Sequence, residues 1–162
     1  MSTVLTDFPG RGRSLNPFVI LDGAAGFIDF ARDVFGAVEN TEARTPTPDG
    51  RLIHAELRVG DSLLLLSDAL DGWVPHPGLF QVWVSDVASV VSQAEEHDAV
   101  VVTPPTPFYG AVTLARVQDA WGNLWWLYQP VPGQADPKPS WEGGSDVVFR
   151  TLDEHLRAVS AR

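Results

Sequence analysis

Two kinds of hydrophobic spacing follow one another along the chain, and they predict alternating strands and helices. Residues 16–21, which read Asn-Pro-Phe-Val-Ile-Leu, form a short apolar run that Asp22 and Gly23 end, as is typical of a buried strand. Residues 24–35 carry apolar side chains at helical spacing and are followed by Gly36, a common C-terminal stop. Further strands are predicted at 37–44, 51–59 and 62–67, with turns at 45–50 and 60–61.

The same order of elements starts again at residue 79. A strand is predicted over 79–84, and a helix follows the capping pair Ser85-Asp86. The remaining strands are predicted at 100–102, 111–117 and 124–129, with a proline-rich loop over 103–110. Two halves with one order of elements predict a duplication of about 55 residues per half. The breaker-rich segment 69–78 is the expected joint between them.

Both ends of the chain lie outside this duplication. Residues 1–15 are predicted as a leader without an apolar run, and residues 131–162 as a linker followed by an amphipathic helix over 146–159. This helix either packs on its own domain or a partner subunit, or serves a specific interaction.

Composition excludes several kinds of site. The chain has no cysteine, which excludes disulfides, thiolate metal sites and cysteine nucleophiles and fits a reducing compartment. It has no stretch of about 18 apolar residues, so we expect a cytoplasmic protein without membrane contact. A formal net charge of -10 repels phosphate backbones, so nucleic acid is a poor partner and cationic or neutral ligands are favoured. The same acidity also serves solubility.

Five segments in order resemble one known family. Residues 16–22, 28–37, 48–57, 60–68 and 117–125 are similar to the PhnB-type branch of the vicinal oxygen chelate superfamily, which includes glyoxalases, bleomycin-resistance proteins and dioxygenases. The resemblance implies an α+β fold with a βαβββ module at 16–68 and another at 79–130. It also implies that the modules curl into a partly closed barrel with a concave pocket, and that the protein is a homodimer.

Metal-dependent members of this superfamily place ligands on the first and last strands of each module. Carried over, these places hold Asn16, Leu65, Phe80 and Trp126. A shift of one residue would bring Pro17, Leu64, Gln81 or Trp125 instead. Neither set supplies a carboxylate or an imidazole to offset dehydration of a divalent ion. We therefore expect no metal and no other cofactor.

The polar candidates for ligand contact or catalysis come mainly from one strand. Along 51–59, the alternation puts His54 and Glu56 on the face opposite Ala55 and Leu57. An imidazole beside a carboxylate could act as a general base or bind a cationic group, or the pair could simply face solvent. If they face the same pocket, Asn16 would add an amide and Arg116 a positive charge.

Aromatic residues supply the apolar candidates. Six tryptophans are present, and three of them, Trp121, Trp125 and Trp126, cluster near the last predicted strand. Phe80 and Trp126 at the former ligand places would give a flat compound an aromatic wall, and Tyr109 could cover the mouth of the pocket. These rings could equally fill the core.

Three functions are compatible with these features. The leading hypothesis is a metal-independent small-molecule-binding protein that holds an aromatic or cationic compound in an aromatic-lined pocket. The first alternative is a metal-independent enzyme in which His54 and Glu56 transfer a proton in an isomerase or lyase reaction. The second is a dimeric interaction module. No Gly-rich phosphate loop or Gly-x-Ser-x-Gly elbow supports a nucleotide-dependent or standard hydrolase function.

Overall fold

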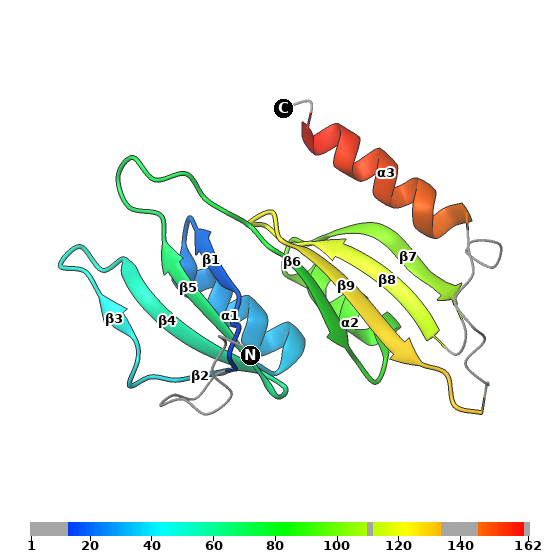
Figure 1. Ribbon diagram of the computed structural model, residues 1–162, viewed down its shortest axis with the longest axis horizontal. Coiled ribbons are helices and arrows are strands. Elements are labelled where there is room, and N and C mark those ends of the chain that lie inside the picture. The colour runs from blue at the N-terminus through cyan, green and yellow to red at the C-terminus, as the bar shows by residue number, and fades with distance from the viewer. Residues whose placement is uncertain (1–12, 110–111, 134–145, 161–162) are drawn as a thin grey trace, which may run out of the picture. The chain divides into compact units, whose positions relative to one another are not determined.

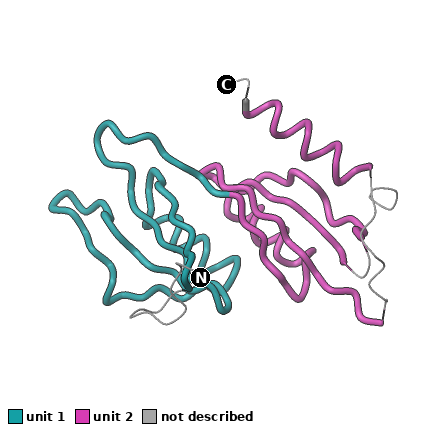
Figure 2. Tube along the Cα trace, viewed as in Figure 1, with its two compact units in different colours: residues 1–78 teal, residues 79–162 magenta. Residues whose placement is uncertain are grey.

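The chain divides into two compact units. The computed structural model describes residues 13–109, 112–133 and 146–160. Unit 1 spans residues 1–78 and unit 2 spans residues 79–162 (Figure 2). Most of the predicted leader, 1–12, and most of the predicted linker, 134–145, lie outside the described residues.

Unit 1 is a mixed sheet with one helix (Figure 1). Its elements are β1 (Phe18–Leu21), α1 (Ala24–Phe35), β2 (Val38–Glu39), β3 (Thr45–Pro46), β4 (Leu52–Val59) and β5 (Ser62–Asp68). The strand order is β1-β5-β4-β2, and β3 pairs with β4. Strand β1 runs parallel to β5, whereas the other pairs are antiparallel. Of the strand predicted over 37–44, only the short β2 forms, and β3 lies in the segment 45–50 that was predicted as a turn.

Helix α1 begins and ends as its sequence predicts. Its apolar face, which includes Phe27, Phe30 and Ala31, is fully buried. Gly36 ends the helix in a left-handed conformation, with φ 64°, which a residue without a Cβ adopts at little cost. The helix start has no cap of its own, because Gly23 carries no side chain.

A carboxylate on β5 supplies the missing cap. The Oδ1 of Asp68 accepts hydrogen bonds from the backbone N–H groups of Gly23 at 3.0 Å and Ala24 at 2.7 Å. Its Oδ2 accepts from the N–H of Leu52 at 2.6 Å. Asp68 is 6% exposed, and it ties the helix start to two strands.

Unit 2 repeats the same connectivity and adds a helix. Its elements are β6 (Leu79–Trp83), α2 (Val87–Glu96), β7 (Val100–Phe108), β8 (Val112–Gln118), β9 (Leu124–Pro130) and α3 (Asp146–Ser160). The strand order is β6-β9-β8-β7, with β6 parallel to β9. On β9, Gln129 accepts a hydrogen bond from the N–H of Val87, the first residue of α2, at 2.8 Å. A last-strand side chain therefore holds the helix start in both units, and the fold is α+β with two βαβββ modules.

The predicted loop over 103–110 is largely wrong. Strand β7 continues to Phe108, through the prolines at 104, 105 and 107, as the edge strand of the sheet. Its pairing with β8 shifts register twice, between Val101 and Thr106. Proline lacks an N–H donor, and an edge strand with bulges is the place in a sheet that tolerates this loss.

The two faces of the unit 2 sheet are covered by different helices. Helix α2 packs on β7, β8 and β9, and α3 packs on β7. Val148 in the first turn of α3 is fully buried, and Thr151 bonds to Thr103 of β7, with 2.7 Å between the hydroxyl oxygens. None of the helices in the described ranges is long and apolar enough to span a membrane.

The Asp68 cap can be tested by truncation. Asp68→Ala removes three hydrogen bonds and leaves buried N–H groups without an acceptor, so we expect a loss of about 2–4 kcal/mol in the free energy of unfolding. Asp71→Ala is the matched control, because that side chain is 96% exposed and pairs with Arg51 at the surface. It should change stability by less than about 1 kcal/mol. Equal urea midpoints for the two variants would contradict the role of Asp68.

Candidate functional site

The face of the unit 1 sheet turned away from α1 carries the polar candidates. On β4, Ala55 and Leu57 are fully buried on the helix side. His54 and Glu56 alternate with them, and their side chains remain 34% and 21% exposed. Leu52 shares their face but is buried at the start of the strand. This sheet therefore has one apolar face under a helix and one partly open face.

His54 and Glu56 lie beside each other on this open face. The Nε2 of His54 is 3.5 Å from the Oε1 of Glu56, an ion pair when the imidazole is protonated. The Nδ2 of Asn40 donates to the Oε2 of Glu56 at 2.8 Å, which fixes the carboxylate. The Phe18 ring lies 6.3 Å from the His54 ring, so an aromatic surface adjoins the pair. A positive group on a flat ring would find both an acceptor and a stacking surface here.

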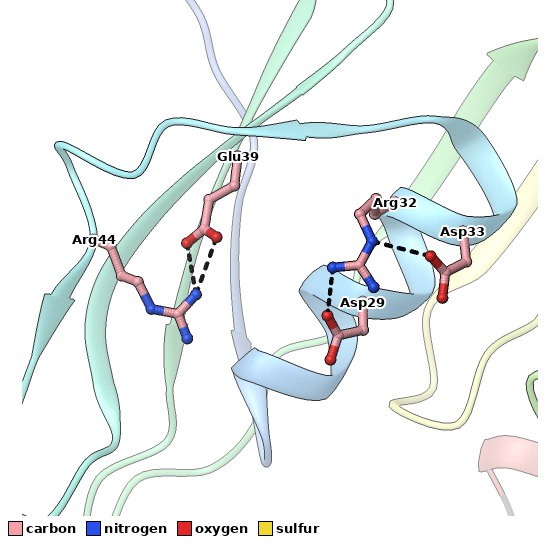
Figure 3. Close-up of polar contacts among 5 residues, drawn as sticks. All are labelled: Asp29, Arg32, Asp33, Glu39 and Arg44. Carbon is pink, nitrogen blue, oxygen red and sulfur yellow. Dashed lines mark hydrogen bonds and ion pairs between the residues drawn. The ribbon is translucent and has the colours of Figure 1, made fainter.

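A hollow of about 580 Å³ lies next to Glu56 on unit 1. It is lined by Val38, Glu39, Asn40, Thr41, Glu42, Glu56, Arg58, Asp61, Ser62 and Leu63. Figure 3 shows that Glu39 is engaged by the Nη1 of Arg44, at 2.8 and 3.0 Å. Four of the lining side chains are acidic and one is basic, so the hollow favours cations.

The same figure shows a second ion-pair group on α1. Arg32 lies between Asp29, at 2.7 Å, and Asp33, at 3.0 Å. All three side chains are at least 40% exposed, and none of them lines the hollow. Exposed pairs of this kind contribute little to stability, and we assign them no part in the site.

The facing positions on the first and last strands do not suit a divalent ion. In unit 1, Phe18 pairs with Leu65, and in unit 2, Gln81 pairs with Trp126. Asn16 lies before β1, and its amide closes a turn with the backbone of Arg13 at 2.8 and 2.7 Å. Within the described ranges, no three His, Cys, Asp or Glu residues are grouped so that they could hold a metal. The donor set at these places therefore does not fit the ion that metal-dependent superfamily members use.

Arg116 and Trp126 meet on the face of the unit 2 sheet that α3 covers. The guanidinium carbon lies 3.9 Å from the centre of the Trp126 ring. Arg116 is 1% exposed, and its Nη1 donates to the Thr103 hydroxyl at 3.1 Å and to the Val148 carbonyl of α3 at 2.7 Å. Burial lowers the pKa of Arg116, because the charged form loses its hydration.

The two remaining aromatic candidates lie elsewhere in unit 2. Phe80 pairs with Trp125, and their ring centres are 4.6 Å apart. Since neighbouring strand residues point to opposite faces, Phe80 does not share a face with Trp126. Tyr109 follows β7 and packs edge-on against Phe108 at 4.5 Å. Phe108 in turn lies 6.4 Å from Phe149 of α3, so Tyr109 belongs to the aromatic cluster at this helix.

Sequence reasoning missed four contacts of these two groups. Phe18 and Asn40 adjoin the His54 and Glu56 pair, and Thr103 and Val148 bind Arg116. The Asn40 bond joins positions 16 residues apart, and the Val148 bond joins positions 32 apart, so local spacing carries no signal for them. Phe18 could have been found from the alternation within the first strand.

Comparison with known proteins places the chain in a family. It is 33% identical over 129 residues to the uncharacterized protein Mb0911c of Mycobacterium bovis. The match covers 73% of this chain and 84% of that protein. No protein-family model matches the chain.

Solved structures show the same fold at lower identity. Protein PA1353 from Pseudomonas aeruginosa has a TM-score of 0.60 at 19% identity, over 72% of this chain and 97% of that chain. A glyoxalase/bleomycin resistance protein/dioxygenase family enzyme from Burkholderia phytofirmans has a TM-score of 0.59 at 18% identity, over 70% and 95%. A PhnB protein from Bacillus cereus has a TM-score of 0.54 at 15% identity, over 71% and 98%. The chain belongs to the family of Mb0911c, and its fold is that of the vicinal oxygen chelate superfamily.

Proposed function

We propose that this chain is a metal-independent small-molecule-binding protein that holds an aromatic or cationic compound on the open face of the unit 1 sheet. The single observation that supports it best is the grouping of Phe18, His54 and Glu56 on that face, away from α1. A half-exposed ring and a fixed carboxylate beside an acidic hollow are the parts that a flat cation requires. The absence of cysteine fits a cytoplasmic location.

The chemistry of the face favours binding over metal-assisted catalysis. Phe18 and Leu65 occupy the facing positions on β1 and β5, so the row next to Glu56 is apolar. Apolar side chains hold a ligand by area burial, at about 25 cal/mol per Å². Of the three paired side chains Phe18, Leu65 and Glu56, only Glu56 could ligate a divalent ion, and one carboxylate does not replace the hydration shell of the ion.

Metal independence has a direct test. We expect the purified protein to contain no stoichiometric zinc, nickel, iron or manganese, and a chelator to leave its melting temperature unchanged. Elemental analysis and thermal unfolding with and without chelator measure this. One tightly bound divalent ion per chain would overturn it.

The binding face can be tested with benzyltrimethylammonium, a small aromatic cation. Glu56→Gln keeps the shape of the side chain and removes its charge, so affinity should fall by about 3- to 30-fold. Phe18→Ala should weaken binding by a similar factor through lost stacking. Calorimetric titration measures both.

Glu96→Gln is the matched control, because Glu96 is an exposed residue at the end of α2 in unit 2. It makes the same change of charge in the other compact unit and should leave affinity unchanged. Equal losses for Glu56→Gln and Glu96→Gln would show that only net charge matters, and the site would be rejected.

The 3.5 Å contact between His54 and Glu56 favours proton transfer as a second candidate function. For a binder, the ligand is recovered unchanged and His54→Ala lowers affinity only modestly. For an enzyme, the same variant should lower turnover by about 100-fold or more while affinity stays nearly intact. Product analysis after incubation separates the two functions.

We also propose that the chain forms a homodimer. A homodimer is also expected if the protein is an interaction module. Leu156 and Val159 of α3 are 44% and 49% exposed, and such an apolar stripe is commonly covered by a partner. Light scattering should give the mass of two chains at micromolar concentration, and Leu156→Glu should shift the mass toward one chain. A single-chain mass for the wild-type protein at high micromolar concentration would contradict the dimer.

A further inference from the structure

Arg116 is a buried cation that has no anionic partner among the described residues. Buried arginines normally pair with a carboxylate, because desolvation of an unpaired guanidinium is costly. Within residues 13–109, 112–133 and 146–160, Arg116 has no ion pair, and its acceptors are one hydroxyl and one backbone carbonyl. A carbonyl dipole offsets a full positive charge only in part.

Two further donors at this place are unused. The Nε of Arg116 and the Nε1 of Trp126 are buried, and neither has a hydrogen-bond partner in the described part of the chain. The two side chains are stacked, with 3.9 Å between the guanidinium carbon and the ring centre, so both donors belong to one small region. Buried donors without acceptors are rare in folded proteins, and a bound ligand or water is one explanation for them. A partner for these donors has to be an acceptor, and a negative charge would serve best.

An aromatic row adjoins these donors on the same face. Leu114, Tyr128 and Trp83 pair across β8, β9 and β6, two residues along from the row of Arg116 and Trp126. The Tyr128 ring lies 5.4 Å from the Trp83 ring and 6.3 Å from the Phe108 ring. Trp83 is 60% exposed, so the row extends from the buried guanidinium to solvent. A ligand with an oxyanion next to an aromatic ring would match the guanidinium and the adjoining aromatic side chains.

We propose that Arg116 and Trp126 form a binding site for the oxyanion of a small aromatic acid, and that the first turn of α3 occupies this site in the ligand-free protein. The Val148 carbonyl, 2.7 Å from the Nη1 of Arg116, stands where an oxygen of the ligand would bind. A carboxylate or phosphonate would bring a full negative charge and further acceptor oxygens for the unused N–H groups. Binding requires the first turn of α3 to leave, so helix and ligand compete.

The contacts of α3 suit such a competition. Between residues 146 and 159, only Val148 is fully buried, whereas Phe149 is 38% exposed and Leu156 44%. Two polar bonds connect the first half of α3 to the sheet: the Arg116 bond to the Val148 carbonyl and the bond between Thr103 and Thr151. A helix that buries only one of its side chains fully can undock at a lower free-energy cost than the core strands of the sheet. The apparent affinity for the acid is then reduced by the fraction of molecules in which α3 is docked.

Benzoate is the probe for this site. In wild-type protein we expect weak binding, and Val148→Ala combined with Thr151→Val should raise the affinity for benzoate by about tenfold, because these changes weaken docking of α3 without altering the site. Adding Arg116→Gln to the same background should abolish the gain. Val100→Ala is the control for the valine truncation, because Val100 is 63% exposed on β7, and it should bind benzoate like the wild-type protein.

A second measurement keeps the proposal testable if the double variant folds poorly. In wild-type protein at millimolar benzoate, the indole N–H resonance of Trp126, assigned with Trp126→Phe, should shift downfield as the Nε1–H gains an acceptor. Circular dichroism confirms folding of each variant. An unmoved Trp126 resonance at saturation, or a benzoate affinity that Arg116→Gln leaves unchanged, would overturn the proposal.

This site is independent of the open face of unit 1, and the two probes differ in charge. Binding of benzyltrimethylammonium should respond to Glu56→Gln and not to Arg116→Gln, whereas binding of benzoate should do the reverse. Loss of one response with the other intact therefore shows which of the two sites fails.

Discussion

In each unit, one helix covers one face of the sheet, and the structure depends on what lies on the other face. A strand points alternate side chains to opposite faces, and one helix can cover only one of them. In unit 1, α1 covers Ala55 and Leu57, and the other face carries His54 and Glu56, which tolerate water. In unit 2, Leu114 and Arg116 lie on the second face and are buried, and α3 packs on that side. The second face therefore carries polar side chains in unit 1 and is covered by an additional helix in unit 2.

This difference also separates the electrostatics of the two faces. Glu56 and the acidic lining of the hollow give unit 1 a negative surface, in keeping with the net charge of -10. Unit 2 holds a positive charge beneath α3, and burial is the main cause that lowers the pKa of this guanidinium, with Tyr128 acting in the opposite direction. The two faces therefore differ in the sign of the charge that they carry, although both belong to βαβββ modules.

Local patterns in the sequence predicted the elements better than the contacts between them. Helix α1 matched its predicted bounds because apolar spacing and Gly36 are local signals. Strand β7 did not match its predicted bounds, because its pairing with β8 overrides the turn preference of three prolines. The side of Phe80 depends on its pairing with Trp125, a register that alternation alone leaves open. The alternation did place His54 and Glu56 on one face, whereas the docking of α3 on Arg116 joins distant segments and has no local signal.

In the proposed site of unit 2, α3 and the ligand would share the donors of Arg116, so their binding would be thermodynamically coupled. The N–H group that bonds to the Val148 carbonyl cannot also bond to a ligand oxygen in the same geometry. A change that strengthens the docking of α3 therefore lowers the affinity for the ligand by the same factor. The reverse also holds, since an occupied site would free the first turn of α3 and expose Val148, which is fully buried when docked. Because Val148 lies about two turns before Leu156, the exposed apolar stripe at Leu156 and Val159 would then extend toward the start of the helix. A partner that binds this stripe would favour the open face of unit 2, and so the helix can carry information between the ligand and the partner without any change in the sheet itself.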